Sequence, residues 1–418
     1  MGITPGEVNP KLHLVTAAQL LTDPFDVSRQ PAALLIDQAN GHFVAIGGEA
    51  LSRHAEASLR THFEQGVLAP ALIDCHVHLV LPGDGSFGEA SLELSDEELL
   101  ARSLENATAA LNAGVVAVQD QGSRGSVGLA ARAAARSKAH SHPLLSVAGR
   151  PITVSNGHMW YYGGTADGAE AVGTMAGHLV GEGVDLLKLV ASGGGTKGSN
   201  EFLASYTVDE LRAGVEVAHQ NDLVAAAHAG CADAIANACE AGCDVIHHCN
   251  FYTPRGIQEF DPRLASRLAE AGVAVDPTLW VTQSLLEALR PLAGEGDPDS
   301  KTELERFERH WVGKHRDVQG LIEAGVRMIA GSDAGWRYVR FGDTWREVAA
   351  LADFGLSNRA AYAAATTHAA EALRRADRTG QIKRGYDADF LVLTANPTED
   401  LSSLAKPTAI YRLGTRVG

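Results

Sequence analysis

The chain has 418 residues, of which 45% are hydrophobic and 21% charged, a composition typical of a globular protein with a large core. The formal net charge of −16 and the lack of basic clusters argue against a nucleic-acid partner, because phosphate binding depends on grouped lysines and arginines. No apolar run reaches the length of about 18 residues that would predict a membrane-spanning helix.

The two ends of the chain have the same character. Residues 1–68 contain short apolar runs such as Ala32–Ile36 and Phe43–Ile46, and residues 380–418 contain Asp389–Leu393 and Ile410–Leu413. The first residues lack a basic segment followed by an apolar stretch, so no signal peptide is expected. Neither end alone buries much apolar surface. We therefore predict that residues 1–68 and 380–418 pair into one small composite β-sandwich domain.

Residues 69–379 alternate short apolar runs with longer segments of helical pattern. Capping boxes at Ser95–Glu98 and Thr207–Glu210 mark helix starts, and several helices end in a glycine just before the next run. The apolar runs are Ala71–Ile73, Val115–Val118, Leu144–Ala148, Val184–Val190, Leu223–Ala227, Val245–Ile246, Val273–Val275 and Val326–Ala330. This repetition of strand and helix predicts the α/β class and a (β/α)8 TIM barrel, which needs about 250 residues.

One charged residue interrupts the fourth apolar run. Lys188 lies in the middle of Asp185–Ala191, and a buried ammonium costs several kcal/mol unless it is neutralised or paired. A strand shorter than predicted would leave it exposed. Reaction of the amine with CO2 would instead turn it into a carbamate, an anionic oxygen ligand able to bridge two metal ions. The residue is therefore a candidate metal ligand.

Catalytic groups of such a barrel lie at the C-terminal ends of its strands. His76 and His78 are two residues apart and face the same side of the first strand. A single histidine at a strand end is more often structural, and Asp333 could simply cap the next helix. The coincidence of suitable residues at five strand ends favours a metal site, with a metal-bridging hydroxide as nucleophile and a carboxylate as its proton acceptor. These residues are His76, His78, Lys188, His228, His247 or His248, and Asp333.

The sequence resembles the amidohydrolase superfamily, in the carboxylated-lysine binuclear subgroup of prolidase-like and ochratoxinase-like amidohydrolases. The resemblance covers nearly the whole chain. It is carried by Leu72–His78, Gly157–Gly164, Leu187–Gly194, Ala227–Ala229, Val245–His248, Gly331–Asp333 and Gly380–Asp389.

The resemblance implies a role for each candidate. His76 and His78 would bind the α metal, Lys188 would bridge, and His228 with His248 would bind the β metal. Asp333 would bind the α metal and act as general base. Relatives often carry Ile-Glu-His at the sixth strand. His247 stands where they have the glutamate and His248 where they have the histidine, which favours His248 as the ligand, although His247 stays an alternative.

Three further features bear on substrate binding. His158, in a Gly-His context typical of the subgroup, would polarise the substrate carbonyl or bind a carboxylate; a loop histidine packed on Trp160 is the structural alternative. Gly230 stands where prolidase-like relatives carry an aromatic residue or histidine, which predicts a roomier pocket. The glycine-rich Ser192–Asn200 does not match a phosphate-binding loop and is expected to let the backbone pass close to the metals.

We therefore predict a metal-dependent hydrolase that cleaves an amide, carbamate or urea C–N bond of a small, bulky or aromatic molecule. Its cofactors would be two divalent ions, Zn2+ by expectation, with the Lys188 carbamate. The alternatives are an Xaa-Pro or other dipeptidase, a mononuclear deaminase, which needs no lysine on the fourth strand, and a non-catalytic barrel. We also expect a small-molecule partner only, no membrane or nucleic-acid partner, a homo-oligomer, and a location in the reducing cytoplasm, where the five cysteines would stay free.

Overall fold

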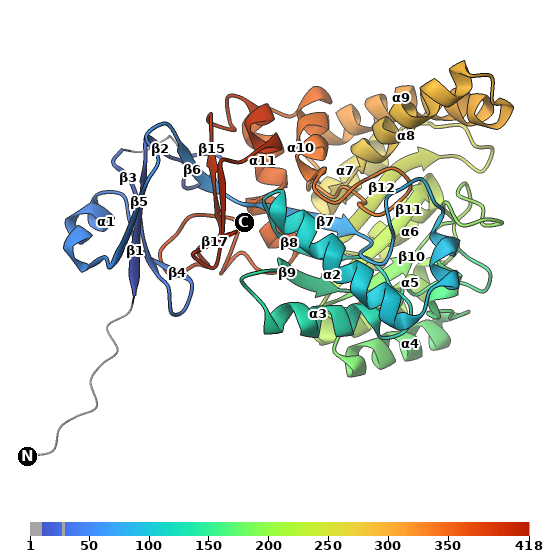
Figure 1. The fold of residues 1–418 in the computed structure, drawn as a ribbon. Helices are drawn as coiled ribbons and strands as arrows, with labels where there is room; N and C mark the ends of the chain where they lie inside the picture. Colours follow the sequence, from blue (N-terminus) through green and yellow to red (C-terminus); the bar gives the residue numbers. More distant parts are fainter. Residues whose placement is uncertain (1–10, 27–29, 418) are drawn as a thin grey trace, which may run out of the picture.

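A computed structural model describes residues 11–26 and 30–417. The first residues, on which the expectation of no signal peptide rests, lie outside the described part. Figure 1 shows a group of strands from both ends of the chain beside a larger part that contains most of the helices. None of the described helices is long and apolar enough to cross a membrane.

The larger part is built on parallel strands that follow one another in chain order. A three-stranded sheet has the order β7-β8-β9, and a five-stranded sheet has the order β10-β11-β12-β13-β14. Each apolar run predicted between residues 71 and 330 forms one of these strands. Their bounds are β7 Leu72–Val77, β8 Val115–Asp120, β9 Leu144–Val147, β10 Leu186–Val190, β11 Val224–Cys231, β12 Val245–Tyr252, β13 Ala274–Asp276 and β14 Arg327–Met328. The predicted α/β class is confirmed.

Backbone hydrogen bonds connect the two parallel sheets at both of their edges. Ile152, just after β9, donates its N–H to the carbonyl of Lys188 on β10 (2.8 Å). At the other edge Cys75 of β7 donates to the carbonyl of Ala330, just after β14 (2.9 Å). The C-terminal ends of the strands therefore gather on one side of the molecule.

Helices separate the parallel strands, as the capping signals predict. Both capping boxes are present: the side chains of Ser95 and Thr207 accept from the backbone N–H three residues on, and the glutamate there accepts in return. Gly183 ends α4 in the left-handed conformation (φ 84°), which an L side chain rarely adopts. The helices are α2 Asp96–Asn112, α3 Val127–Ser137, α4 Ala169–Glu182, α5 Val208–Gln220, α6 Ala232–Ala241, α7 Pro262–Glu270, α10 Thr344–Asp353, α11 Asn358–Ala364 and α12 Thr367–Ala372.

Two long helices stand out between β13 and β14. α8, Leu279–Gly294, and α9, Pro298–Glu323, pack on each other and rise at the upper right of Figure 1. Most residues of α9 are polar, and only a few of its positions are fully buried. The sequence pattern did not single out this pair.

The two chain ends form two further sheets, the first from the N-terminal end alone and the second from strands of both ends. One has the order β4-β3-β1-β5 and the other β17-β16-β15-β6-β2. An apolar cluster joins Val15, Leu34 and Phe43 to Phe390 and Tyr411. β6 pairs along its length with β15, so this sheet continues two residues past the predicted boundary at residue 68. The elements are β1 Leu12–Ala17, β2 Gln19–Leu20, β3 Ala32–Asp37, β4 His42–Ile46, α1 Gly48–Ser52, β5 Leu59–His62, β6 Val67–Pro70, β15 Phe390–Leu393, β16 Ala409–Arg412 and β17 Thr415–Val417.

The alternation of side chains along the parallel strands decides which residues face the interior. An apolar layer contains Ile73, Ala117, Leu186, Ala226, Val245 and Ala274 from different strands. Because side chains two residues apart in a strand share a face, the next layer toward the C-terminal ends holds Lys188, His228, His247 and Asp276. A polar layer thus follows directly on an apolar one.

Candidate active site

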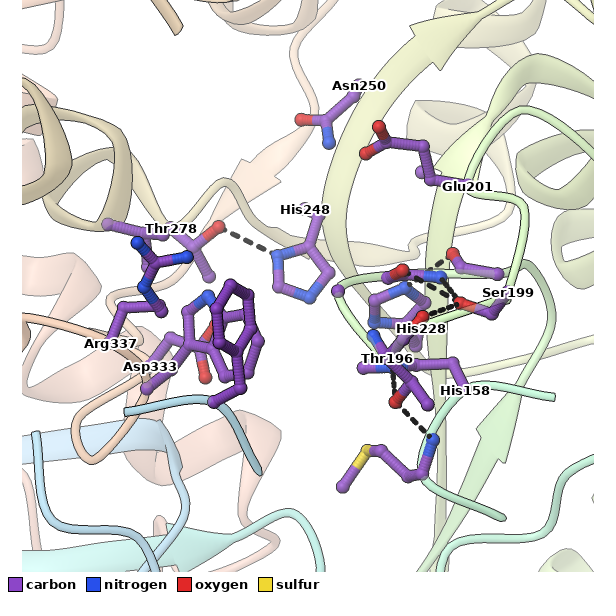
Figure 2. A pocket seen from close by; sticks show the side chains of 18 of the residues that line it. His158, Thr196, Ser199, Glu201, His228, His248, Asn250, Thr278, Asp333 and Arg337 are labelled. Atoms are coloured by element: carbon purple, nitrogen blue, oxygen red, sulfur yellow. Dashed lines mark hydrogen bonds between the residues drawn. The ribbon is translucent and has the colours of Figure 1, made fainter. Parts of the chain in front are cut away.

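A cavity of about 530 Å³ opens at the C-terminal ends of the parallel strands. Figure 2 shows His228, His248 and Asp333 around it, with His158 and Thr196 nearby. The cavity wall includes nearly all of the predicted site residues: His76, His78, His158, Lys188, His228, His248 and Asp333. His247 does not line it.

The first group in the cavity is formed by the two histidines of the β7 end and the aspartate that follows β14. Asp333 Oδ1 lies 3.5 Å from His76 Nε2 and 3.4 Å from His78 Nε2. All three side chains are buried, and they lie close enough together to hold a metal ion. Asp333 Oδ1 has no hydrogen-bond partner among the described residues, which is costly unless a cation is bound there.

The second group is the pair His228 and His248, whose ring centroids lie 4.5 Å apart. The Nε2–H of His228 donates to the Gly193 carbonyl (3.1 Å), which leaves Nδ1 as an acceptor. Nδ1 of His248 is hydrogen-bonded to Thr278 Oγ1 (2.9 Å), as drawn in Figure 2, which leaves Nε2. Each ring therefore keeps one nitrogen for another ligand.

The two adjacent histidines of β12 have different surroundings. His247 is fully buried, and its Nδ1 donates to Asp276 Oδ2 (2.9 Å). The same carboxylate oxygen accepts from Nδ1 of His76 (2.9 Å). His248, in contrast, reaches the cavity. His247 therefore helps to hold Asp276 in place, and Asp276 in turn orients the ring of His76.

Lys188 lies at the bottom of the site with only 1% of its surface exposed. Its Nζ has no hydrogen-bond partner among the described residues. Burial lowers the pKa of the amine to about 7, and the charge of Asp333 opposes this shift. The charge of Lys188 in turn lowers the pKa values of His78 and His228, although burial has the larger effect. Lys188 therefore lies within electrostatic range of both histidine groups.

His158 borders the cavity opposite to the first group. Thr196 contributes two contacts to His158 Nδ1, from Oγ1 (2.8 Å) and from its backbone N–H (3.3 Å). Because the backbone N–H of Thr196 can only donate, Nδ1 is an acceptor, and the Thr196 hydroxyl, which accepts from the Met159 N–H (3.0 Å), donates to it as well. The proton of the neutral ring is then on Nε2. Burial lowers the pKa of His158 to about 3, so the ring is neutral at physiological pH.

Three polar residues that orient these histidines were missed by the sequence analysis. They are Thr196 beside His158, Asp276 beside His76 and His247, and Thr278 beside His248. Asp276 could have been identified from the sequence, because it directly follows an apolar run at the C-terminal end of a strand. Thr196 and Thr278 could not, since their contacts depend on loop conformation.

The aromatic residues that follow β9, β13 and β14 divide into two groups. Trp336, Tyr161 and Tyr162 line the cavity. Trp280 is buried away from it, with Nε1 donating to Asp343 (3.3 Å), and Trp160 is 43% exposed outside it. Four further aromatics reach the wall from elements far apart in sequence: Phe87, Phe202, Tyr252 and Phe307.

The loop between β10 and α5 passes close to the histidines, as expected from its glycines. A Cβ at Gly194 would lie 2.8 Å from both His158 Cδ2 and His228 Nε2. By comparison, a Cβ at Gly230 would meet no atom closer than 3.5 Å. Glycine is therefore sterically required at Gly194, whereas Gly230 leaves room for a larger side chain or for substrate.

Comparison with known proteins identifies the family of the chain. Residues 67–415 match the amidohydrolase family. The ochratoxinase of Aspergillus niger is 26% identical over 435 aligned positions, which cover 96% of this chain and 85% of that protein. The chain therefore belongs to the amidohydrolase family and is a hydrolase of amide-type C–N bonds.

Solved structures show the same fold. A Xaa-Pro dipeptidase with bound methionine superposes with a TM-score of 0.84 at 22% identity, covering 97% of this chain and 99% of the other. The crystal structure of A. niger ochratoxinase gives a TM-score of 0.81 at 24% identity, covering 97% and 95%.

Proposed function

We propose that the protein is a binuclear metal-dependent amidohydrolase whose parallel strands form a (β/α)8 barrel, residues 69–379, with a composite β-sandwich from 1–68 and 380–418. His76, His78 and Asp333 would hold one divalent ion, and His228 and His248 the other. The observation that carries the proposal is Lys188 Nζ, which is buried with no hydrogen-bond partner in the described part of the chain and lies within electrostatic range of both histidine pairs.

Lys188 is proposed to carry a carbamate. Its neutral amine would form a bond to the carbon of CO2 and release one proton, which yields an anionic carbamate with two oxygens. Two oxygens can face two cations, and the negative charge offsets the cost of burying the site. The donor set, mainly imidazoles with carboxylate-type oxygens, suits Zn2+. When bound, the ions would supply a nucleophile at neutral pH by lowering the pKa of water.

The remaining roles belong to side chains of the chain itself. Asp333, as general base, would accept the proton of the attacking water and return it to the leaving nitrogen. His158 would hold the substrate carbonyl, or a carboxylate, through Nε2–H. The neutral tautomer set by Thr196 supports this role because it leaves a donor on that nitrogen.

A small molecule with a bulky or aromatic group is the proposed substrate. The aromatic wall and the open space at Gly230 support it, since a buried side-chain-sized apolar group contributes roughly 1.5–3 kcal/mol. An amide bond is further supported by the relatives named ochratoxinase and Xaa-Pro dipeptidase. The cytoplasmic location and the homo-oligomer stay predictions from the sequence.

A substrate panel combined with metal analysis tests this function. N-acyl amino acids, dipeptides such as Gly-Pro, aryl ureas and carbamates would be compared by kcat/KM on protein loaded with Zn2+. We expect bulky or aromatic amide-type substrates to be preferred and about two ions per chain. A preference for small dipeptides would indicate a dipeptidase. One ion per chain together with deaminase activity would indicate a mononuclear enzyme, and the absence of bound ions would indicate a non-catalytic barrel.

A further inference from the structure

The end of β12 has an irregular backbone at the point where it supplies a proposed metal ligand. His248 (φ 70°), Cys249 (φ 53°) and Phe251 (φ 53°) all adopt left-handed conformations, which are uncommon for residues other than glycine. The pairing with β11 also shifts register here: Ala229 pairs with His248, but Cys231 pairs with Tyr252. β12 therefore carries extra residues relative to its neighbour, as in a bulge.

The bulge explains how two adjacent histidines can both belong to the site. In a regular strand, neighbouring side chains point to opposite faces. The side chain of His247 points to the interior and is hydrogen-bonded to Asp276. In a regular strand, the side chain of His248 would therefore point outward, toward the helices. The left-handed turn brings the His248 ring back to the cavity, 4.5 Å from His228.

A buried lysine of α9 holds this turn. Lys314 is 1% exposed, and its ammonium donates to the carbonyl of His248 and to Asn250 Oδ1 (2.6 Å). None of the ion pairs among the described residues includes it. Carboxylates such as Asp317 and Glu347 interact with it only at longer range, and burying an ammonium without a carboxylate in direct contact is costly, so its position calls for a reason beyond packing.

The neighbouring residues on the same face of α9 also bind to β12 or the loop after it. His310 Nδ1 is hydrogen-bonded to the Tyr252 hydroxyl (2.7 Å), and Asp317 accepts from Gln258 Nε2 (2.7 Å). His310, Lys314 and Asp317 are spaced four and three residues apart, so they share one side of the helix. This polar face fixes α9 against the irregular end of the strand.

We propose that Lys314 is a positioning residue that sets His248 as a metal ligand by holding its carbonyl in the left-handed turn. The inference rests on the proposed metal site. Thr278 fixes the ring from Nδ1 and Lys314 fixes the backbone, so the direction of Nε2 is determined from two sides. Removing such a supporting contact typically lowers metal affinity by about 10- to 100-fold.

Zinc binding to the Lys314→Met variant tests the proposal without a substrate. The metal-free protein would be loaded with Zn2+, dialysed, and analysed for metal content and for the rate of zinc transfer to a chromogenic chelator. We expect one ion to be retained as in the wild type and the other to be bound about 10- to 100-fold more weakly. Lys301→Met is the matched control, because Lys301 is exposed on the same helix and should behave as wild type.

The outcomes separate this inference from the proposed function. A wild type that never binds two ions would contradict the function itself. A folded Lys314→Met protein that holds two ions and releases them at the wild-type rate would contradict only the role of Lys314. If that variant does not fold, Lys314→Gln tests the same contact. Its amide is uncharged and one bond shorter than the lysine, so it should not hold the His248 carbonyl in place, and one ion should be bound more weakly; unchanged binding there would overturn the proposal.

Discussion

Lys188 is informative because its charge conflicts with the apolar residues around it. An ammonium in an apolar run is unfavourable whatever the fold, so the sequence alone marks it as chemically special. The structure places it 1% exposed without a partner among the described residues. The role of the other site residues depends on what lies beside them, and that is visible only in three dimensions.

Replacing Lys188 by alanine should remove most activity and lower the metal content. Short carboxylic acids such as acetate or propionate should partly restore the rate, because they can occupy the place of the carbamate. Lys197→Ala, at an exposed site in the following loop, is the control. Wild-type metal content and rate in the Lys188→Ala protein would contradict the carbamate.

Asp333 should control the acidic limb of the pH–rate profile. Burial raises its pKa to about 7, and the charge of Lys188 opposes the shift. A base acts only when unprotonated, so activity falls as pH drops through the pKa of Asp333. The opposing charge is that of the unmodified lysine; in the loaded site the bound cations would take its place and lower the pKa, so we expect the limb below pH 7. Asp333→Asn should reduce kcat by at least about a hundredfold. A mild loss with the same pH limb would identify Asp333 as structural.

Thr196 should tune His158 without affecting the metals. Thr196→Val removes the hydroxyl that donates to Nδ1, and a lost hydrogen bond of about 1 kcal/mol corresponds to roughly a fivefold lower kcat/KM. Thr196→Ser keeps the hydroxyl and should restore the rate, while both variants retain the metal content of the wild type. Equal rates in the valine and serine variants would show that the Thr196 hydroxyl does not tune His158.

At the scale of elements, regular structure was predictable and irregular structure was not. Apolar runs, capping boxes and terminal glycines report local preferences, and each predicted run is a strand. Simple alternation along β12 would have placed His247, not His248, in the interior, because alternation takes no account of the left-handed turn at His248. The choice of His248 came from resemblance, and the positions of Trp160 and Trp280 could not be read from sequence because they depend on loops.

The glycine-rich loop after β10 offers a steric prediction. Gly194→Ala would place a Cβ 2.8 Å from the rings of His158 and His228, so we expect weaker zinc binding and lower activity. Gly177→Ala is a suitable control, since Gly177 lies in α4 with no atom within 4 Å of its would-be Cβ. That change should stabilise the protein by up to about 1 kcal/mol. Equal zinc affinity in both variants would remove the steric argument.

For the whole molecule, strands from both chain ends share one apolar cluster. The proposed metal site lies instead among buried polar groups contributed by many strands. Such a site should be stabilised by its ions. At a free metal concentration of about 100 times the Kd, each ion adds about 2.7 kcal/mol to the free energy of unfolding. Chelation should therefore lower Tm, and an unchanged Tm would argue against a structural contribution of the metals.

Anomalous X-ray scattering from crystals of the zinc-loaded protein tests the central claim most directly. The account predicts two zinc peaks, one at His76, His78 and Asp333 and one at His228 and His248, with continuous density beyond Lys188 Nζ that bridges them. A single peak, a peak at His247 in place of His248, or an unmodified Lys188 between two ions would contradict it.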